Sequence, residues 1–226
     1  DDPHKSDLSA LFTSSKDDSH NSDRSSSVRG AVADVEEVRK LFYRLPETAQ
    51  ELQTIARTLG APKESVFLRE EATEKKVKSM DLNNARIIAF ATHGLISGEM
   101  KGLTEPALVL TPPKVGSLED DGLLTASEIA QLKLDADLVI LSACNTASSD
   151  GKPGAEGLSG LARSFFYAGA RSLLVSHWPV ESESAMKLTT GMFTELAEQP
   201  GIGRAEALKL AQLSLIQDDK NPKFAH

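Results

Sequence analysis

The chain has 226 residues, of which 40% are hydrophobic and 5% aromatic, and its formal net charge is −8. This size predicts one or two globular domains, and the negative charge argues against a general nucleic-acid or anionic-membrane binder. No apolar run approaches the roughly 18 to 20 residues of a membrane span, and the first ten residues lack the pattern of a signal peptide. The single cysteine, Cys144, allows no internal disulfide, as expected in the cytoplasm.

The N-terminal stretch, residues 1–33, is rich in Ser and Asp and carries few apolar side chains. We expect a flexible segment or loop there, because its burial cannot offset the entropy of ordering. Asp34 is the predicted N-cap of a first amphipathic helix, and a second helix follows Pro46 and ends at Gly60. Residues 34–226 are therefore expected to form the folded domain.

Three apolar runs further along the chain predict strands that are buried on both faces. Their alternation with amphipathic helices favours an α/β fold with a mostly parallel sheet covered by helices. The strands are Ala85–His93 (ARIIAFATH), Ala136–Thr146 (ADLVILSACNT) and Ala170–Trp178 (ARSLLVSHW). The other predicted elements are a short strand at Ser65–Leu68, a hairpin or edge pair at Ala107–Leu110 and Gly122–Leu124, and helices near 72–80, 125–132, 158–169, 183–198 and 204–217.

Each long strand becomes polar at its carboxyl end, where open α/β sheets place their ligands. If the strands are parallel, one sheet edge gathers His93, Cys144 and His177. A cysteine nucleophile needs an imidazole within hydrogen-bond reach, and in caspase-like peptidases the histidine precedes the cysteine by about 50 residues. The N–H groups of Gly94 and Cys144 could then form an oxyanion hole.

Simpler interpretations of these residues stay open. A lone buried cysteine is usually a small core residue, and a histidine at a strand end is usually structural. His177 is a rival base, although Trp178 beside it suggests a pocket wall, and Ser142 is a conceivable nucleophile that more simply lines or packs the site. The sequence contains no zinc-binding spacing, P-loop or G-x-G-x-x-G motif after a strand, so we expect neither a metal nor a cofactor.

Several motifs in a fixed order carry a family resemblance from Leu45 to His226. They are LPET at Leu45–Thr48, ATHG at Ala91–Gly94, LVILSACNT at Leu138–Thr146, AEGLSGLARSFFYAGARSLLVSHWPV at Ala155–Val180 and NPKF at Asn221–Phe224. In these motifs the chain resembles the CHAT family, caspase-like peptidase domains that are related to separases and often fused to tetratricopeptide repeats. The resemblance implies a caspase–hemoglobinase-like three-layer sandwich with a mostly parallel central sheet flanked by helices.

The resemblance also implies a cysteine endopeptidase that cleaves a protein substrate. Cys144 is carried over as the nucleophile and His93 as the general acid/base. Regulation by a tetratricopeptide-repeat domain, or by another attached or partner domain, is expected from the family. The alternative is a catalytically silent CHAT-like scaffold, and a redox sensor ranks last because Cys144 has no second cysteine to pair with.

The chain departs from the family pattern around the predicted substrate pocket, which we assign to Trp178, Glu181 and Ser182. The family usually has Leu before the tryptophan, where this chain has His177. It commonly has Asp four residues after the tryptophan, which separases use to hold a basic residue before the scissile bond. Ser182 stands there, between Glu181 and Glu183, so a preference for Arg or Lys is in doubt. Family members also extend further at both ends, and we expect this domain to be truncated relative to them.

Overall fold

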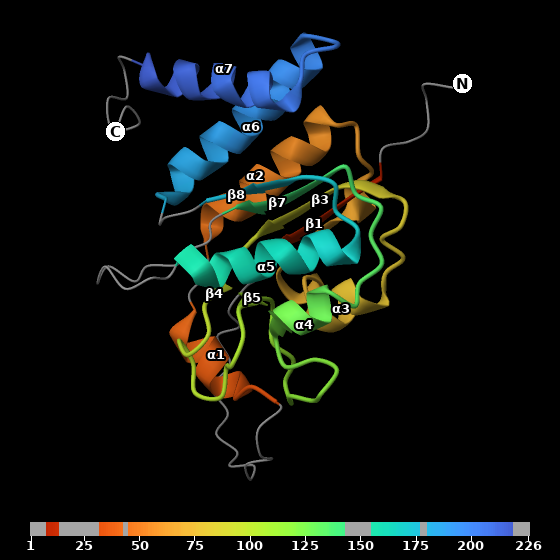
Figure 1. Cartoon of the computed structure of the whole chain (residues 1–226), viewed down its shortest axis with the longest axis vertical. Helices are drawn as coiled ribbons and strands as arrows, with labels where there is room; N and C mark the ends of the chain where they lie inside the picture. The colour runs from red at the N-terminus through yellow and green to blue at the C-terminus, as the bar shows by residue number, and fades with distance from the viewer. Residues whose placement is uncertain (1–7, 14–31, 43–44, 143–154, 177–179, 219–226) are drawn as a thin grey trace.

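The computed structural model describes residues 8–13, 32–42, 45–142, 155–176 and 180–218. At its centre lies a parallel five-stranded sheet with the strand order β2-β1-β3-β7-β8 (Figure 1). These strands are β1 (Leu8–Thr13), β2 (Val66–Leu68), β3 (Ala85–Ala91), β7 (Leu138–Ser142) and β8 (Leu173–Val175). The prediction of a parallel sheet in an α/β fold is confirmed. The prediction that the third apolar strand is buried on both faces was wrong, because β8 is the outermost strand of the described sheet and its residues are only half-buried.

Strand β1 lies inside the segment that we expected to be flexible, so this expectation was wrong for Leu8–Thr13. The strand is internal to the sheet, with Ala10 beside Ile88 of β3 and Phe12 beside Phe67 of β2. Such a strand is stabilised by neighbours far away in the sequence, and its own composition signals it weakly. The rest of the predicted segment, apart from residues 32 and 33, lies outside the described residues.

Helices cover both faces of the central sheet (Figure 1). One face carries α2 (Pro46–Thr58) and α6 (Ser182–Glu198), with α7 (Arg204–Ile216) packed on α6; the other carries α3 (Glu74–Ser79), α4 (Ala126–Ile129) and α5 (Ala155–Ala168). Side chains of β3 alternate between the two faces. Ile88 and Phe90 belong to the core under α5, whereas Ala89 and Ala91 belong to the core under α2 and α6. The result is a helix–sheet–helix sandwich.

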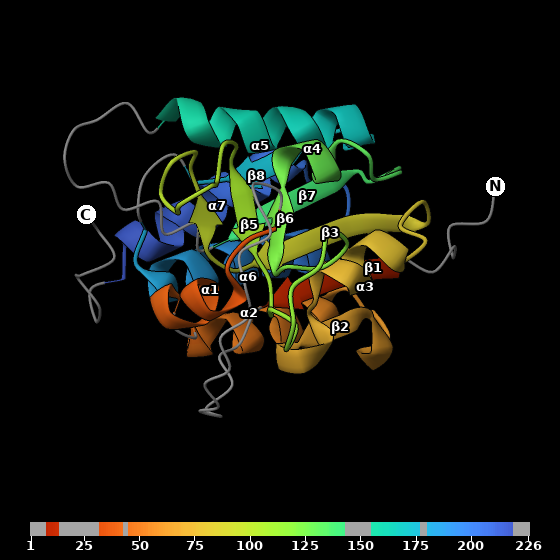
Figure 2. The same cartoon turned by 90° about the horizontal axis from the view of Figure 1, so that it is seen from below.

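A second, smaller sheet follows β3 directly and lies on the side turned to the viewer in Figure 2. It is antiparallel and consists of β4 (Gly94–Leu95), β5 (Ala107–Val109) and β6 (Leu123–Thr125). The predicted pairing of residues 107–110 with 122–124 is confirmed. Helix α1 (Val35–Leu41) packs on this sheet through Val38, and its N-cap is Asp34, as predicted.

The remaining described elements are two short 3₁₀ turns, η1 (Lys63–Ser65) and η2 (Arg69–Glu71). The predicted capping box at the start of α4 is present: the Thr125 backbone N–H donates to Glu128 Oε2 at 2.9 Å. Within the described ranges, no helix is long and apolar enough to cross a membrane.

Candidate active site

The carboxyl ends of β3, β7 and β8 lie side by side at one edge of the central sheet. Ala91, the last residue of β3, pairs with Ser142, the last residue of β7. Leu141 of β7 pairs in turn with Val175, the last residue of β8. The prediction that the three strands are parallel neighbours ending at one edge is therefore confirmed.

The described part of this edge includes some of the predicted site residues. His93, Gly94, Ser142, Glu181 and Ser182 are described, whereas Cys144, His177 and Trp178 lie outside the described residues. The register between β3 and β7 pairs residues 51 positions apart, from Ile87 with Leu138 to Ala91 with Ser142. The same interval of 51 positions separates His93 from Cys144 in the sequence.

His93 lies where the chain leaves the central sheet for the small sheet. Its side chain is 3% exposed, and its ring centroid is 5.6 Å from that of Phe42 at an interplanar angle of 45°. Its backbone carbonyl accepts a hydrogen bond from the N–H of Val109 at 2.9 Å. The preceding residue, Thr92, donates its N–H to the Ser142 carbonyl at 3.3 Å. The backbone around His93 is thus bonded to both sheets.

Gly94, the predicted oxyanion-hole donor, is a buried residue of β4 that pairs with Leu108. The N–H of Val109 donates to the carbonyl of His93, so His93 and Val109 occupy a hydrogen-bonded position of the antiparallel ladder. The next pair, Gly94 and Leu108, therefore occupies a non-hydrogen-bonded position. The N–H of Gly94 is therefore directed away from β5.

A buried carboxyl group, Glu51 of α2, lies next to the end of β7. Glu51 is 1% exposed and Ser142 5% exposed, and the Ser142 hydroxyl donates to Glu51 Oε2 at 2.9 Å. The other carboxyl oxygen bonds to the hydroxyl of Thr189 from α6. Burial raises the pKa of Glu51, and the hydrogen bonds with Thr189 and Ser142 lower it in part. Ser142 is therefore held by a carboxyl group, which agrees with a packing role.

Glu51 was not among the predicted site residues, although one signal in the sequence could have found it. Thr48, Glu51 and Ile55 follow the i, i+3, i+7 spacing of one helix face, and all three are buried. An acidic residue on the apolar face of a predicted helix is unusual, because a buried carboxyl group needs hydrogen-bond partners. The sequence could therefore flag the position but not its partners.

The predicted pocket residues Glu181 and Ser182 lie at the start of α6. Glu181 is the N-cap of this helix, and its Oε2 accepts from Ser184 N–H at 3.0 Å and from Ser184 Oγ at 2.7 Å. Glu183 forms an ion pair with Lys187 at 3.3 Å. Both carboxylates thus have structural partners, and the assignment of a substrate pocket stays a prediction.

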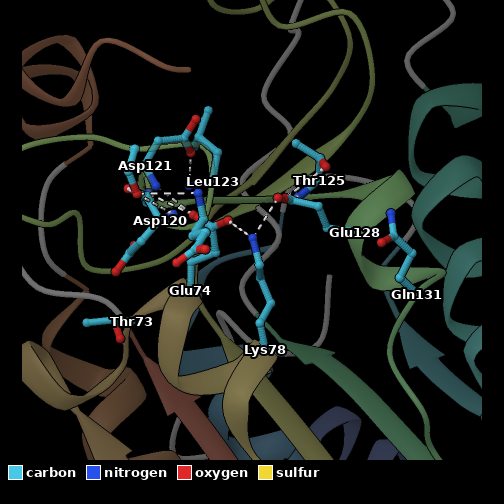
Figure 3. Close-up of polar contacts among 12 residues, drawn as sticks. Thr73, Glu74, Lys78, Asp120, Asp121, Leu123, Thr125, Glu128 and Gln131 are labelled. Atoms are coloured by element: carbon cyan, nitrogen blue, oxygen red, sulfur yellow. Dashed lines mark hydrogen bonds and ion pairs between the residues drawn. The ribbon is translucent and has the colours of Figure 1, made fainter. Parts of the chain in front are cut away.

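A second polar centre, which we call the acidic cluster, consists of Glu74, Asp120, Asp121 and Glu128 around Lys78 (Figure 3). Lys78 Nζ lies 2.8 Å from both Glu74 Oε1 and Glu128 Oε1. Glu74 Oε2 accepts from the backbone N–H of Asp121 at 2.8 Å and of Gly122 at 3.1 Å. Burial raises the pKa of Glu74 to about 8.

Asp121 connects the acidic cluster to the chain ahead of α1. One of its oxygens accepts from Ala33 N–H at 2.6 Å and the other from Leu123 N–H at 3.0 Å. These contacts with the backbone and with Lys78 indicate that the acidic cluster joins α3, α4 and the small sheet. Within the described residues, no group of three or more His, Cys, Asp or Glu side chains is arranged to hold a metal ion.

Comparison with known proteins identifies the family. The family model described as the CHAT domain matches residues 3–226. This chain belongs to the CHAT domain family. The match begins ahead of the expected domain start at residue 34, and so it includes β1.

Two relatives of this CHAT domain are the proteins named Tetratricopeptide repeat protein 28 of Mus musculus and of Homo sapiens. Each is 27% identical to it over 212 residues, and the match covers 78% of this chain and 8% of the relative. The chain therefore spans a small part of the length of these relatives.

Proposed function

We propose that this CHAT domain is a cysteine endopeptidase with a caspase–hemoglobinase-like fold, in which Cys144 is the nucleophile and His93 the general acid/base. The observation that supports this proposal is a shared interval in the sequence. Ala91 and Ser142, which are paired at the ends of β3 and β7, are 51 positions apart, and so are His93 and Cys144. Neighbouring parallel strands are about 4.8 Å apart, so residues that follow two paired strand ends can act on one substrate.

The proposed reaction is an acyl transfer to the thiol. The Cys144 thiolate attacks the carbonyl carbon of the scissile peptide bond, and the N–H groups of Gly94 and Cys144 stabilise the oxyanion. His93 gives its proton to the leaving amine as the C–N bond breaks. His93 then takes a proton from water, which attacks the thioester and releases the acid product and the free cysteine. The orientation of the Gly94 N–H away from β5 supports its part in this scheme.

Regulation by a repeat domain is part of the proposal, because the relatives are named as tetratricopeptide repeat proteins and are far longer than this chain. The same names specify no peptidase, which favours a second candidate. In that case the domain is a catalytically silent scaffold that binds partner proteins.

A diverse peptide library distinguishes the two candidates. We expect cleavage by the wild type and by Lys101→Ala, a control at an exposed position, and a loss of at least about 100-fold in Cys144→Ala and His93→Ala. Cleavage that persists in Cys144→Ala refutes the proposed nucleophile. If no variant cleaves and iodoacetamide alkylates Cys144 no faster than an ordinary thiol, the scaffold is supported.

A further inference from the structure

Glu51 is a carboxyl group enclosed in the apolar layer between α2, α6 and the central sheet. Leu52 and Ile55, which follow it on α2, belong to the apolar core on this face of the sheet. Among the described residues, no Lys or Arg forms an ion pair with Glu51. A carboxyl group in such surroundings is costly unless both of its oxygens are hydrogen-bonded.

Both oxygens of Glu51 have partners, and each partner belongs to a different element. Ser142, which donates to Oε2, is the last residue of β7 and lies two positions before Cys144. Thr189, which bonds to Oε1, lies on α6, 138 positions away in the sequence. Glu51 thus connects α2 and α6 to the strand end that leads into the proposed nucleophile.

The hydrogen-bond geometry accommodates an uncharged Glu51. The Thr189 hydroxyl also lies 2.9 Å from the Ala185 carbonyl oxygen, and it has a single proton to donate. If that proton goes to Ala185, Thr189 can accept one from Oε1 of a protonated Glu51, while Oε2 accepts from Ser142. All three side chains are then hydrogen-bonded without a buried charge. Burial raises the pKa of Glu51, which also favours the protonated carboxyl group.

We propose that Glu51 is a positioning residue, which holds the carboxyl end of β7 in place for the thiol chemistry of Cys144 through its hydrogen bond with Ser142. This inference rests on the function proposed above. Ser142 is also the register partner of Ala91, which lies two positions before His93. A displacement of about 1 Å at a reacting group can cost about 100-fold in rate, so a bond this close to the strand end affects the reaction.

The test compares Glu51→Gln, Glu51→Ala and Ser142→Ala with the wild type. Gln50→Ala is the matched control, because Gln50 is the exposed neighbour of Glu51 on α2. Glutamine keeps one donor and one acceptor, so we expect Glu51→Gln to stay within about 3-fold of the wild-type kcat. Glu51→Ala and Ser142→Ala should lower kcat by about 100-fold with little change in KM, and the double variant should be no worse than either one.

Amide hydrogen exchange of the peptide covering residues 136–146 is a readout that does not require peptidase activity. We expect faster exchange there in Glu51→Ala but not in Glu51→Gln, with β2 unchanged in both. If Glu51→Ala fails to fold, Ser142→Ala and Thr189→Val test the same bonds separately.

The outcomes separate the two proposals. Unchanged exchange and kcat in Glu51→Ala overturn the positioning role, and so does a Glu51→Gln variant as impaired as Glu51→Ala. If the wild type cleaves no peptide and iodoacetamide alkylates Cys144 no faster than an ordinary thiol, the peptidase proposal fails. Faster exchange in Glu51→Ala alone then still supports the positioning of the strand end.

Discussion

The hydroxyl of Thr92 donates a hydrogen bond to the backbone carbonyl of Val109, joining the end of the central sheet to the small sheet. Thr92 is buried, and Val109 also donates its own N–H to the carbonyl of His93. Two bonds from one residue of β5 therefore hold consecutive residues of the segment that carries the proposed general acid/base. The small sheet thus holds the segment that carries His93.

Replacing Thr92 tests this support. Thr92→Val keeps the shape of the side chain but leaves the Val109 carbonyl without its hydroxyl donor, so we expect a loss of about 1–3 kcal/mol in the free energy of unfolding. Urea denaturation measures it, and Thr104→Val, at an exposed position, should change stability by less than about 0.5 kcal/mol. Equal stability of the two variants would show that the Thr92 bond contributes nothing.

Gly169, which ends α5 with φ +114°, should tolerate no side chain. A Cβ there would overlap the carbonyl oxygen of Leu134, in addition to the strain of the left-handed backbone. We expect Gly169→Ala to lower the free energy of unfolding by about 3 kcal/mol, the sum of roughly 1–2 for the backbone and 1–3 for the overlap. Gly201→Ala is the matched control: Gly201 has φ +95° with open space around it, so only the backbone cost of about 1–2 kcal/mol is expected. A similar loss in both variants contradicts the steric explanation.

The acidic cluster predicts that stability depends on pH. The pKa of Glu74 is raised from 4.5 to about 8 by burial, so between these values the folded state keeps a proton that the unfolded state has lost. The contribution of Glu74 to stability is therefore greatest below pH 4.5 and falls as the pH rises to about 8. Burial also raises the pKa of Asp120 and Asp121 above 3.8, so their titration likewise lowers stability as the pH rises.

Urea midpoints at pH 5.5 and 8.5 measure this dependence. The wild type should be less stable at pH 8.5, and the difference should shrink in Glu74→Gln, which cannot titrate. Glu119→Gln is a control on the same side of the molecule, at an exposed position. A wild-type protein that gains stability between these two pH values would contradict the predicted direction.

The charge of Glu181 tests the predicted substrate pocket. If this carboxylate holds a basic residue before the scissile bond, Glu181→Gln should lower kcat/KM for a peptide with Arg at that position by about 10-fold and leave an otherwise identical peptide with Leu unchanged. The glutamine retains an oxygen that can accept from Ser184 N–H, so the N-cap of α6 is preserved. Glu183→Gln tests the other neighbour of Ser182 in the same way. Equal cleavage of the Arg and Leu peptides by the wild type would contradict a pocket that holds a basic residue.

Local patterns predicted the elements that depend on near neighbours in the chain. The capping box of Thr125 and Glu128 and the apolar runs of β3, β7 and β8 could be predicted because caps and apolar runs involve residues a few positions apart. The prediction that these strands end at one sheet edge is also confirmed. The roles of His93 and Cys144 came from the family motifs, and they remain a proposal.

The sequence by itself determined the α/β class, the three apolar strands and the edge at which they end, because these follow from the pattern of apolar residues along each segment. The tertiary structure alone decided that Leu8–Thr13 is an internal strand and that Glu51 meets Ser142 and Thr189. Glu51 and Thr189 are 138 positions apart, and β1 is stabilised by pairing with strands that begin more than 50 residues later. Such contacts depend on how distant segments pack, which no local pattern of residues encodes.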